Sequence, residues 1–135
     1  MKLFIDCEWN SYGGDLISMA LVPLIGESWY EELPCRNPEA WVLENVMPKL
    51  GKQPVTLKYM QDSLQFYLRQ YAKVHIIADW PEDIERFCKL LIVGPGLRLD
   101  TPPLTMEVFR CCTISKNPHN ALADAEALRD WYLML

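Results

Sequence analysis

Positive charge is scarce in this sequence, which has 13 lysines and arginines against 18 aspartates and glutamates and a net charge of −5 at pH 7. A protein that coats long DNA or RNA neutralises many phosphates with basic side chains, so this balance counts against that class. It does not exclude an enzyme that holds a few phosphates through divalent metal ions, because the ions then supply the positive charge.

Long apolar runs and a secretory leader are also missing. No stretch is long enough to span a bilayer. Asp6 and Glu8 interrupt the start "MKLFIDCEWN", where a signal peptide would have its apolar core. We therefore expect a cytoplasmic protein with no membrane association.

Cysteine spacing offers no zinc site. The five cysteines are an odd number without a CxxC pair, and the adjacent Cys111 and Cys112 have poor spacing for zinc ligands. In a cytoplasmic protein we expect reduced thiols, most of them packed as small hydrophobic side chains.

Composition and sequence organisation predict one domain over residues 1–135. The chain is 50% hydrophobic and has no repeat, low-complexity tract or linker. Alternation of apolar and polar residues predicts three strands in an antiparallel meander, at 2–8, 16–24 and 27–33. Apolar spacing and helix-start residues predict four helices, at 37–50 with Asn37 as N-cap, 56–72, 81–91, and from 118–120 to the end.

A short buried strand is predicted at 73–79 and an edge strand at 97–99, whereas the pattern of 106–112 leaves its type open. Three strands followed by alternating helices and strands predict an α/β fold of three layers, with a mixed central sheet flanked by helices. Unrelated functions share such sheets, so the function has to come from particular residues.

Two acids on the first predicted strand indicate a cation site. Asp6 and Glu8 are two residues apart, so both side chains leave the same face of the strand. Adjacent carboxylates repel each other unless a cation lies between them, and the apolar neighbours Leu3–Ile5 indicate burial, which makes unneutralised acids costly. The alternative is a solvated edge strand.

Three more candidate residues come later in the chain. Asp79 ends the strand at 73–79, and Asp83 lies in the first turn of the next helix, near the strand ends where α/β sheets bind ligands. Acids that only stabilise a helix N-terminus are the alternative. We expect His119 in the loop or first turn of the last helix with Asp124 one turn inside, an arrangement that suits a general base beside a metal. A surface or capping histidine is the alternative.

Together, the fragments "DCE", "ADWPED" and "HNALADA" resemble the three motifs of the DEDDh 3′–5′ exonucleases, in the correct order and over nearly the whole chain. The HxAxxDA stretch is the specific part, and the small size resembles the stand-alone exoribonuclease branch. The resemblance implies a ribonuclease-H-like fold and His119 as general base. It also implies two divalent ions held by four acids: Asp6, Glu8, Asp83 and Asp124.

The sequence departs from the family pattern at two places. Asp79 stands where many members have asparagine, which leaves open whether Asp79 or Asp83 is the third acidic ligand, although Asp83 is favoured. The stretch after Glu8 lacks the Thr-Thr-Gly that often follows the glutamate in the family. We expect Asp79 and Trp9 to contact substrate instead, with Trp9 stacking on the last base unless it packs in the core.

The expected function is a metal-dependent 3′–5′ exoribonuclease that acts on nucleic acid with a free 3′ end. Carboxylate oxygens suit Mg²⁺ or Mn²⁺, and a metal pair supplies both the nucleophile and charge neutralisation for phosphodiester hydrolysis. A DNA exonuclease of the same fold and a non-catalytic interaction module are the alternatives. Trp41 and Tyr59 are candidate exposed aromatics for a homodimer interface.

Overall fold

A five-stranded sheet is the centre of the computed structural model, which describes residues 1–110 and 114–135. Its strands lie in the order β3-β2-β1-β4-β7. The bounds are β1 Lys2–Trp9, β2 Leu16–Pro23, β3 Trp29–Glu32, β4 Val74–Ala78 and β7 Leu104–Val108. The first three strands pair antiparallel, whereas β4 is parallel to β1 and β7 is parallel to β4. The predicted mixed sheet with its antiparallel meander is confirmed.

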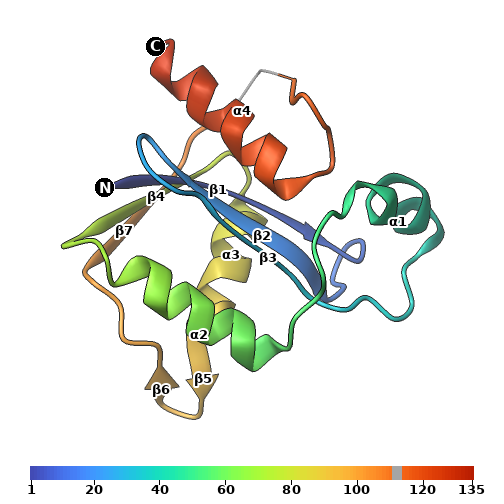
Figure 1. The fold of residues 1–135 in the computed structure, drawn as a ribbon, viewed down its shortest axis with the longest axis horizontal. Coiled ribbons are helices and arrows are strands. Elements are labelled where there is room, and N and C mark those ends of the chain that lie inside the picture. Colours follow the sequence, from blue (N-terminus) through green and yellow to red (C-terminus); the bar gives the residue numbers. More distant parts are fainter. Residues whose placement is uncertain (111–113) are drawn as a thin grey trace.

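Helices cover both faces of this sheet. Figure 1 shows α4 on one face and α2 with α3 on the other. The helices are α1 Ala40–Asn45, a 3₁₀ turn η1 Met47–Lys49, α2 Leu57–Leu68, α3 Pro81–Leu90 and α4 Ala121–Leu133. The predicted three-layer α/β architecture is confirmed. No helix in the described part of the chain is long and apolar enough to cross a membrane.

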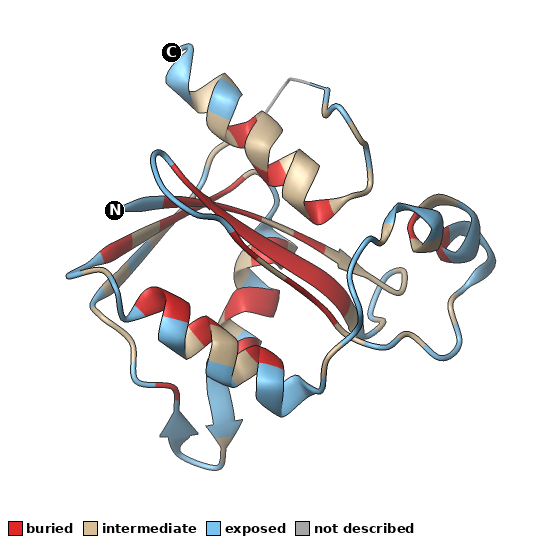
Figure 2. Ribbon diagram, in the orientation of Figure 1, coloured by how far each residue is buried: buried red, intermediate tan, exposed pale blue. Residues whose placement is uncertain are grey.

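Alternation along β1 divides its apolar side chains between two buried clusters. Figure 2 shows buried residues on the sheet and on the helices that cover it. Leu3 and Ile5 point to the α2 and α3 side, where they join the larger apolar cluster. Phe4 points to the other side and packs with Ala121 and Ala125 of α4. Because alanine is small, α4 can approach the sheet closely at these two positions. This close approach brings the first turn of α4 down onto β1.

The segment 37–50 differs from its prediction. The helix begins at Ala40 with Glu39 at the N-cap, and Asn37 does not cap it. Instead, the side chain of Asn10 holds the loop, because its Nδ2 donates to the Asn37 carbonyl at 2.9 Å and its Oδ1 accepts from the Glu39 N–H at 2.8 Å. The helix ends at Asn45, and a short 3₁₀ turn that contains Pro48 follows. A contact from another part of the chain therefore set this helix boundary.

Two other segments also differ. The predicted edge strand at 97–99 is part of a separate hairpin, β5 Ile92–Gly94 and β6 Leu97–Arg98, which does not join the main sheet. The segment 106–112, whose type the sequence leaves open, begins inside β7. This strand lies at one edge of the main sheet and pairs with β4 along its whole length. Cys111 and Cys112 lie outside the described residues. Of the described cysteines, Cys7 is buried, two are half-buried, and all three are free: Cys7, Cys35 and Cys88.

Candidate metal centre

The first strand brings Asp6 and Glu8 to the face of the sheet that α4 covers, as their spacing predicts. Both are half-buried. Their neighbours across the ladder on β2 are small, since Asp6 lies opposite Ala20 and Glu8 lies opposite Ser18. Small partners leave space above the sheet for the carboxylates and for anything that binds between them.

Asp79 follows β4 directly, and Asp83 lies in the first turn of α3. Asp83 is 1% exposed, and its Oδ1 accepts a hydrogen bond from the backbone N–H of Cys7 at 3.1 Å. This bond ties the start of α3 to β1 between Asp6 and Glu8. The strand end and the helix start therefore meet the first two acids, as expected from the parallel pairing of β1 and β4.

The fifth acid comes from the first turn of α4. Asn120 caps this helix, because its side-chain oxygen accepts the N–H of Ala123 at 3.0 Å. Asp124 Oδ2 accepts the backbone N–H of His119 at 3.2 Å. His119 has a φ of 71°, a left-handed conformation that costs about 1–3 kcal/mol in a non-glycine residue and is concentrated at functional sites. The predicted placement of His119 before the helix and Asp124 inside it is confirmed.

The five acids form two groups that share one member. Oxygens of Asp6, Glu8 and Asp124 lie within 4.8 Å of one another, and so do oxygens of Asp6, Asp79 and Asp83. Each group has a geometry that could hold a metal ion. Asp6 is the one member that the two groups have in common.

Burial and mutual repulsion disfavour negative charge at this place. Burial, with the charges of Asp83, Glu8 and Asp124, raises the pKa of Asp6 well above its ordinary value. Burial, with the charge of Asp124, raises the pKa of Glu8 to about 8. Burial, with the charge of Asp79, raises the pKa of Asp83 to about 8. A bound cation would reverse these shifts, because it stabilises the ionised carboxylates.

Three carboxylate oxygens of this centre are buried without a hydrogen-bond donor among the described residues: Asp6 Oδ2, Asp83 Oδ2 and Asp124 Oδ1. Such an oxygen costs about 1–3 kcal/mol when nothing pairs with it, so native proteins have few of them. All three belong to residues of the two groups. Mg²⁺ and Mn²⁺ prefer hard oxygen ligands, and carboxylate oxygens without a hydrogen-bond partner can serve as such ligands. The residues present therefore fit such an ion.

The imidazole ring of His119 lies beside the acids, and it is in neither of the two oxygen groups found among the described residues. It packs edge-on against the indole of Trp41, with ring centroids 5.0 Å apart. Trp41 comes from α1 and is 54% exposed. Sequence reasoning identified Trp41 only as an exposed aromatic, because nothing in the local pattern relates residue 41 to residue 119.

Trp9 lies at the border of the centre. The ladder between β1 and β2 shifts its register between Glu8 and Trp9, and Trp9 lines a cavity of about 240 Å³ with Glu8 and Trp41. Its ring also packs on the core, on the opposite face of the sheet from the carboxylates, where the guanidinium of Arg86 lies 5.2 Å from its centroid. Trp9 thus has features of both expected roles, substrate contact and core packing.

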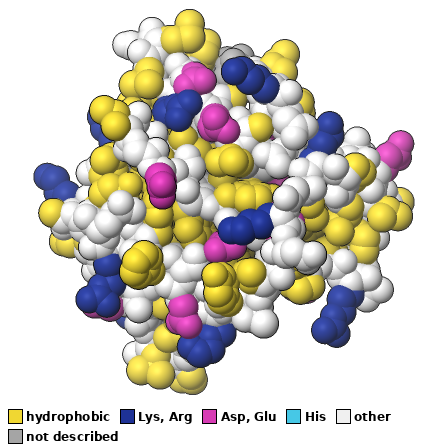
Figure 3. All heavy atoms as spheres, in the orientation of Figure 1, with side chains coloured by type: hydrophobic (Ala, Val, Ile, Leu, Met, Phe, Trp, Pro, Cys, Tyr) yellow, Lys and Arg dark blue, Asp and Glu magenta, His cyan; other side chains and the backbone are white. Residues whose placement is uncertain are grey.

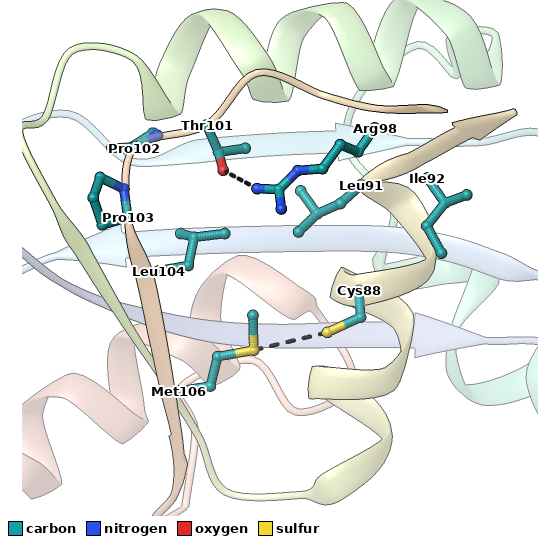
Figure 4. A pocket seen from close by; sticks show the side chains of 9 residues that line it. All are labelled: Cys88, Leu91, Ile92, Arg98, Thr101, Pro102, Pro103, Leu104 and Met106. Carbon is teal, nitrogen blue, oxygen red and sulfur yellow. Dashed lines mark hydrogen bonds between the residues drawn. The ribbon is translucent and has the colours of Figure 1, made fainter. Parts of the chain in front are cut away.

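Another cavity has a different chemistry (Figure 4). It has a volume of about 650 Å³ and lies between α3, the β5–β6 hairpin and the start of β7. Its lining has no carboxylate, and its one arginine, Arg98, donates from Nη2 to Thr101 Oγ1 at 3.1 Å. This cavity has no group suited to phosphodiester hydrolysis.

A scan against protein-family models and a search of curated proteins both found no match for this chain. The roles of its residues therefore follow from geometry, from chemistry and from the motif resemblance.

Proposed function

We propose that this chain is a metal-dependent 3′–5′ exonuclease of the DEDDh type, with RNA as its preferred substrate. The observation that carries the proposal is that Asp6 belongs to both groups of acids. A two-ion hydrolase needs one ligand between its ions and further carboxylates on both sides. A structural cluster of acids has no such need.

The strand arrangement supports a ribonuclease-H-like fold. An antiparallel meander comes first, and two parallel strands then extend the sheet from β1: β4 follows α2, and β7 follows α3 and the β5–β6 hairpin. The acids come from β1, from the end of β4 and start of α3, and from α4, in the order of the three family motifs. The fold and the motif order therefore support the same assignment.

In this proposal, Asp6, Glu8 and Asp124 would hold one ion, and Asp6 and Asp83 would hold the second, with Asp79 beside it. Bound ions would supply a nucleophile from water and neutralise charge on the phosphate. His119 accepts the proton of the attacking water, and its neutral form is required for this role. Its backbone bond to Asp124 fixes the loop that carries the ring.

Surface charge is compatible with a small substrate. Figure 3 shows acidic and basic side chains interspersed on one face of the molecule, without one continuous basic area on that face. A net charge of −5 leaves few cations to pair with phosphates, so the salt dependence of binding should be shallow. The chain should grip a few nucleotides near the 3′ end and release them often.

Single-stranded RNA and DNA of one sequence, each labelled at the 5′ end, test the proposal. With Mn²⁺ or Mg²⁺, we expect a ladder of products shortened from the 3′ end, faster on RNA, and none with a chelator. Faster cleavage of DNA would replace RNA with DNA in the proposal. Absence of cleavage of both substrates, or equal cleavage by Asp124→Asn, would reject the enzyme assignment and leave a non-catalytic module.

A further inference from the structure

A buried cation lies on α3, about one turn after Asp83. Arg86, on α3, is 9% exposed, and its Nε is buried without a hydrogen-bond acceptor among the described residues. None of the ion pairs or side-chain hydrogen bonds found in the described part of the chain includes Arg86. Its guanidinium lies 5.2 Å from the centroid of the Trp9 ring.

A cation–π contact does not replace an anion for a buried guanidinium. Arginine has five donors in a planar fork, which fits a carboxylate or phosphate. Desolvation of a charge costs more than an aromatic face returns, so buried charges in proteins are normally paired. Three acids share α3 with Arg86, and none of them pairs with it among the described residues. Glu85 pairs with Lys89, Glu82 accepts from Trp80 Nε1, and Asp83 accepts from the Cys7 N–H. The Nε of Arg86 is therefore buried without an acceptor in the described part of the chain.

A cavity lies at Arg86. It has a volume of about 410 Å³ and is bounded by the start of β2, the residues after β3, α2, α3 and β5. Most of its walls are apolar: Leu16, Leu33, Pro34, Leu57, Leu90 and Ile92. Lys89, an exposed second cation, also lines it. The size is that of small-ligand sites, which are apolar with a few polar groups.

The walls of this cavity are tied together. Gln61 of α2 donates from Nε2 to the carbonyls of Leu90 and Ile92, at 3.1 and 3.2 Å. These bonds hold α2 against the end of α3 and the start of β5. The hydrogen bonds of Gln61 therefore fix the walls of this cavity. The arginine of the cavity in Figure 4 differs from Arg86, because Arg98 already donates to Thr101.

We propose that this cavity binds a small organic anion, with an apolar body against the leucine walls and a carboxylate or phosphate group on Arg86. Asp15, exposed at the cavity, is the one carboxylate of its lining, and no ion pair joins it to Arg86. No described residue that lines this cavity belongs to the two groups of acids, and binding there needs no catalysis, so the site is tested independently of the nuclease assignment.

Titration with octanoate and hexyl phosphate, two anions on apolar chains, tests this site, and 1-octanol serves as the uncharged control. Calorimetry gives the affinity, and the ¹⁵N–¹H resonance of Arg86 Nε reports contact with the anion. We expect saturable binding of at least one anion with a shift of this resonance. Binding of only one of the two identifies the head group. Arg86→Met should lose about tenfold or more in affinity, since a charge-assisted bond is removed.

Two further variants guard against misfolding of Arg86→Met. Lys89→Glu, at an exposed position, should weaken binding severalfold through repulsion, and Arg98→Met should leave it unchanged. Asp15→Asn should not weaken it. No saturable binding of either anion would overturn the proposal, as would equal affinity in the wild type and Arg86→Met, or octanol binding as tightly as octanoate.

Discussion

Two sets of acids are buried on the central sheet, and they differ in their surroundings. Glu31 and Glu32 of β3 are 4% and 1% exposed. Glu31 accepts from Lys52 Nζ at 2.7 Å and from Ser63 Oγ at 2.9 Å. Glu32 accepts from Tyr30 and from the backbone N–H groups of Gly51 and Lys52. Every carboxylate of this pair has donors from the protein.

The acids around Asp6 have fewer donors. Asp83 and Asp124 each accept one backbone N–H, but three oxygens of the centre are buried and unpartnered among the described residues. Burial, with the charges of neighbouring acids, raises the pKa values of Asp6, Glu8 and Asp83. The pair on β3 ties the segment 51–52 to the sheet, which is a structural role. Burial of an acid alone therefore does not indicate a functional site, whereas burial of a carboxylate oxygen without a hydrogen-bond donor does.

The largest expected effect separates the two sets by activity. Asp6→Asn should lower the rate of RNA cleavage by roughly 10²–10³-fold or more, because it removes the shared ligand of the charge-stabilising ions. Glu31→Gln should leave the rate near that of the wild type and reduce the free energy of unfolding by about 1–2 kcal/mol. Single-turnover rates and urea unfolding measure the two quantities. Equal rate losses in both variants would break the comparison.

The two mid-chain acids, Asp79 and Asp83, give a second test of the comparison between the two sets of acids. Asp83→Asn should cost about 10²-fold in kcat/KM, because Asp83 is buried and points an unpartnered oxygen at the centre. Asp79→Asn should be milder, since asparagine is common at this position in the family that the chain resembles. An inactive Asp79→Asn beside an active Asp83→Asn would show that Asp79 is the ligand.

Stability should depend on pH through the acids around Asp6. Glu8 and Asp83 have pKa values of about 8 in the folded chain, far above those of unfolded carboxyls. The folded state therefore binds more protons between about pH 4 and about pH 8, so stability without metal falls as the pH rises through this window. Melting temperatures measured with a chelator should decline across it, and less steeply in Asp6→Asn. A flat or rising profile would contradict the assigned shifts.

The smallest expected effect concerns Trp41. Its edge contact holds the ring of His119 in place, and aromatic pairs of this kind are worth about 0.5–1.5 kcal/mol. Trp41→Leu removes this contact and should therefore lower kcat by a few-fold to about tenfold. The melting temperature should change little, since Trp41 is half exposed. Tyr59→Leu, at a similarly exposed position on α2, is the control and should have no effect.

Local patterns predicted most of the fold. The strands of the meander, β4 and the helices α2, α3 and α4 follow from alternation, helical spacing and start residues. The start of α1 did not, because Asn10 fixes it from another loop. The pairing of β7 with β4 also depends on distant residues, as does the separation of the β5–β6 hairpin from the main sheet.

The acids of the centre could be named from the sequence, since i and i+2 spacing and strand ends determine where they point. Their division into two groups around Asp6 could not, because it depends on how closely α4 approaches β1 through Ala121 and Ala125. The Nε of Arg86, buried without an acceptor among the described residues, was also not foreseen. Arginine in a helix with acidic neighbours normally predicts an exposed ion pair.

Melting temperature with and without Mn²⁺ tests the central claim most directly, in wild type, Asp6→Asn and Glu31→Gln. At about 100 times its dissociation constant, an ion bound only by the folded state adds about 2.7 kcal/mol, or roughly 5–10 °C for a chain of this size. The account predicts this rise in wild type and Glu31→Gln and its loss in Asp6→Asn. An equal rise in all three proteins, or no rise in the wild type, would contradict it.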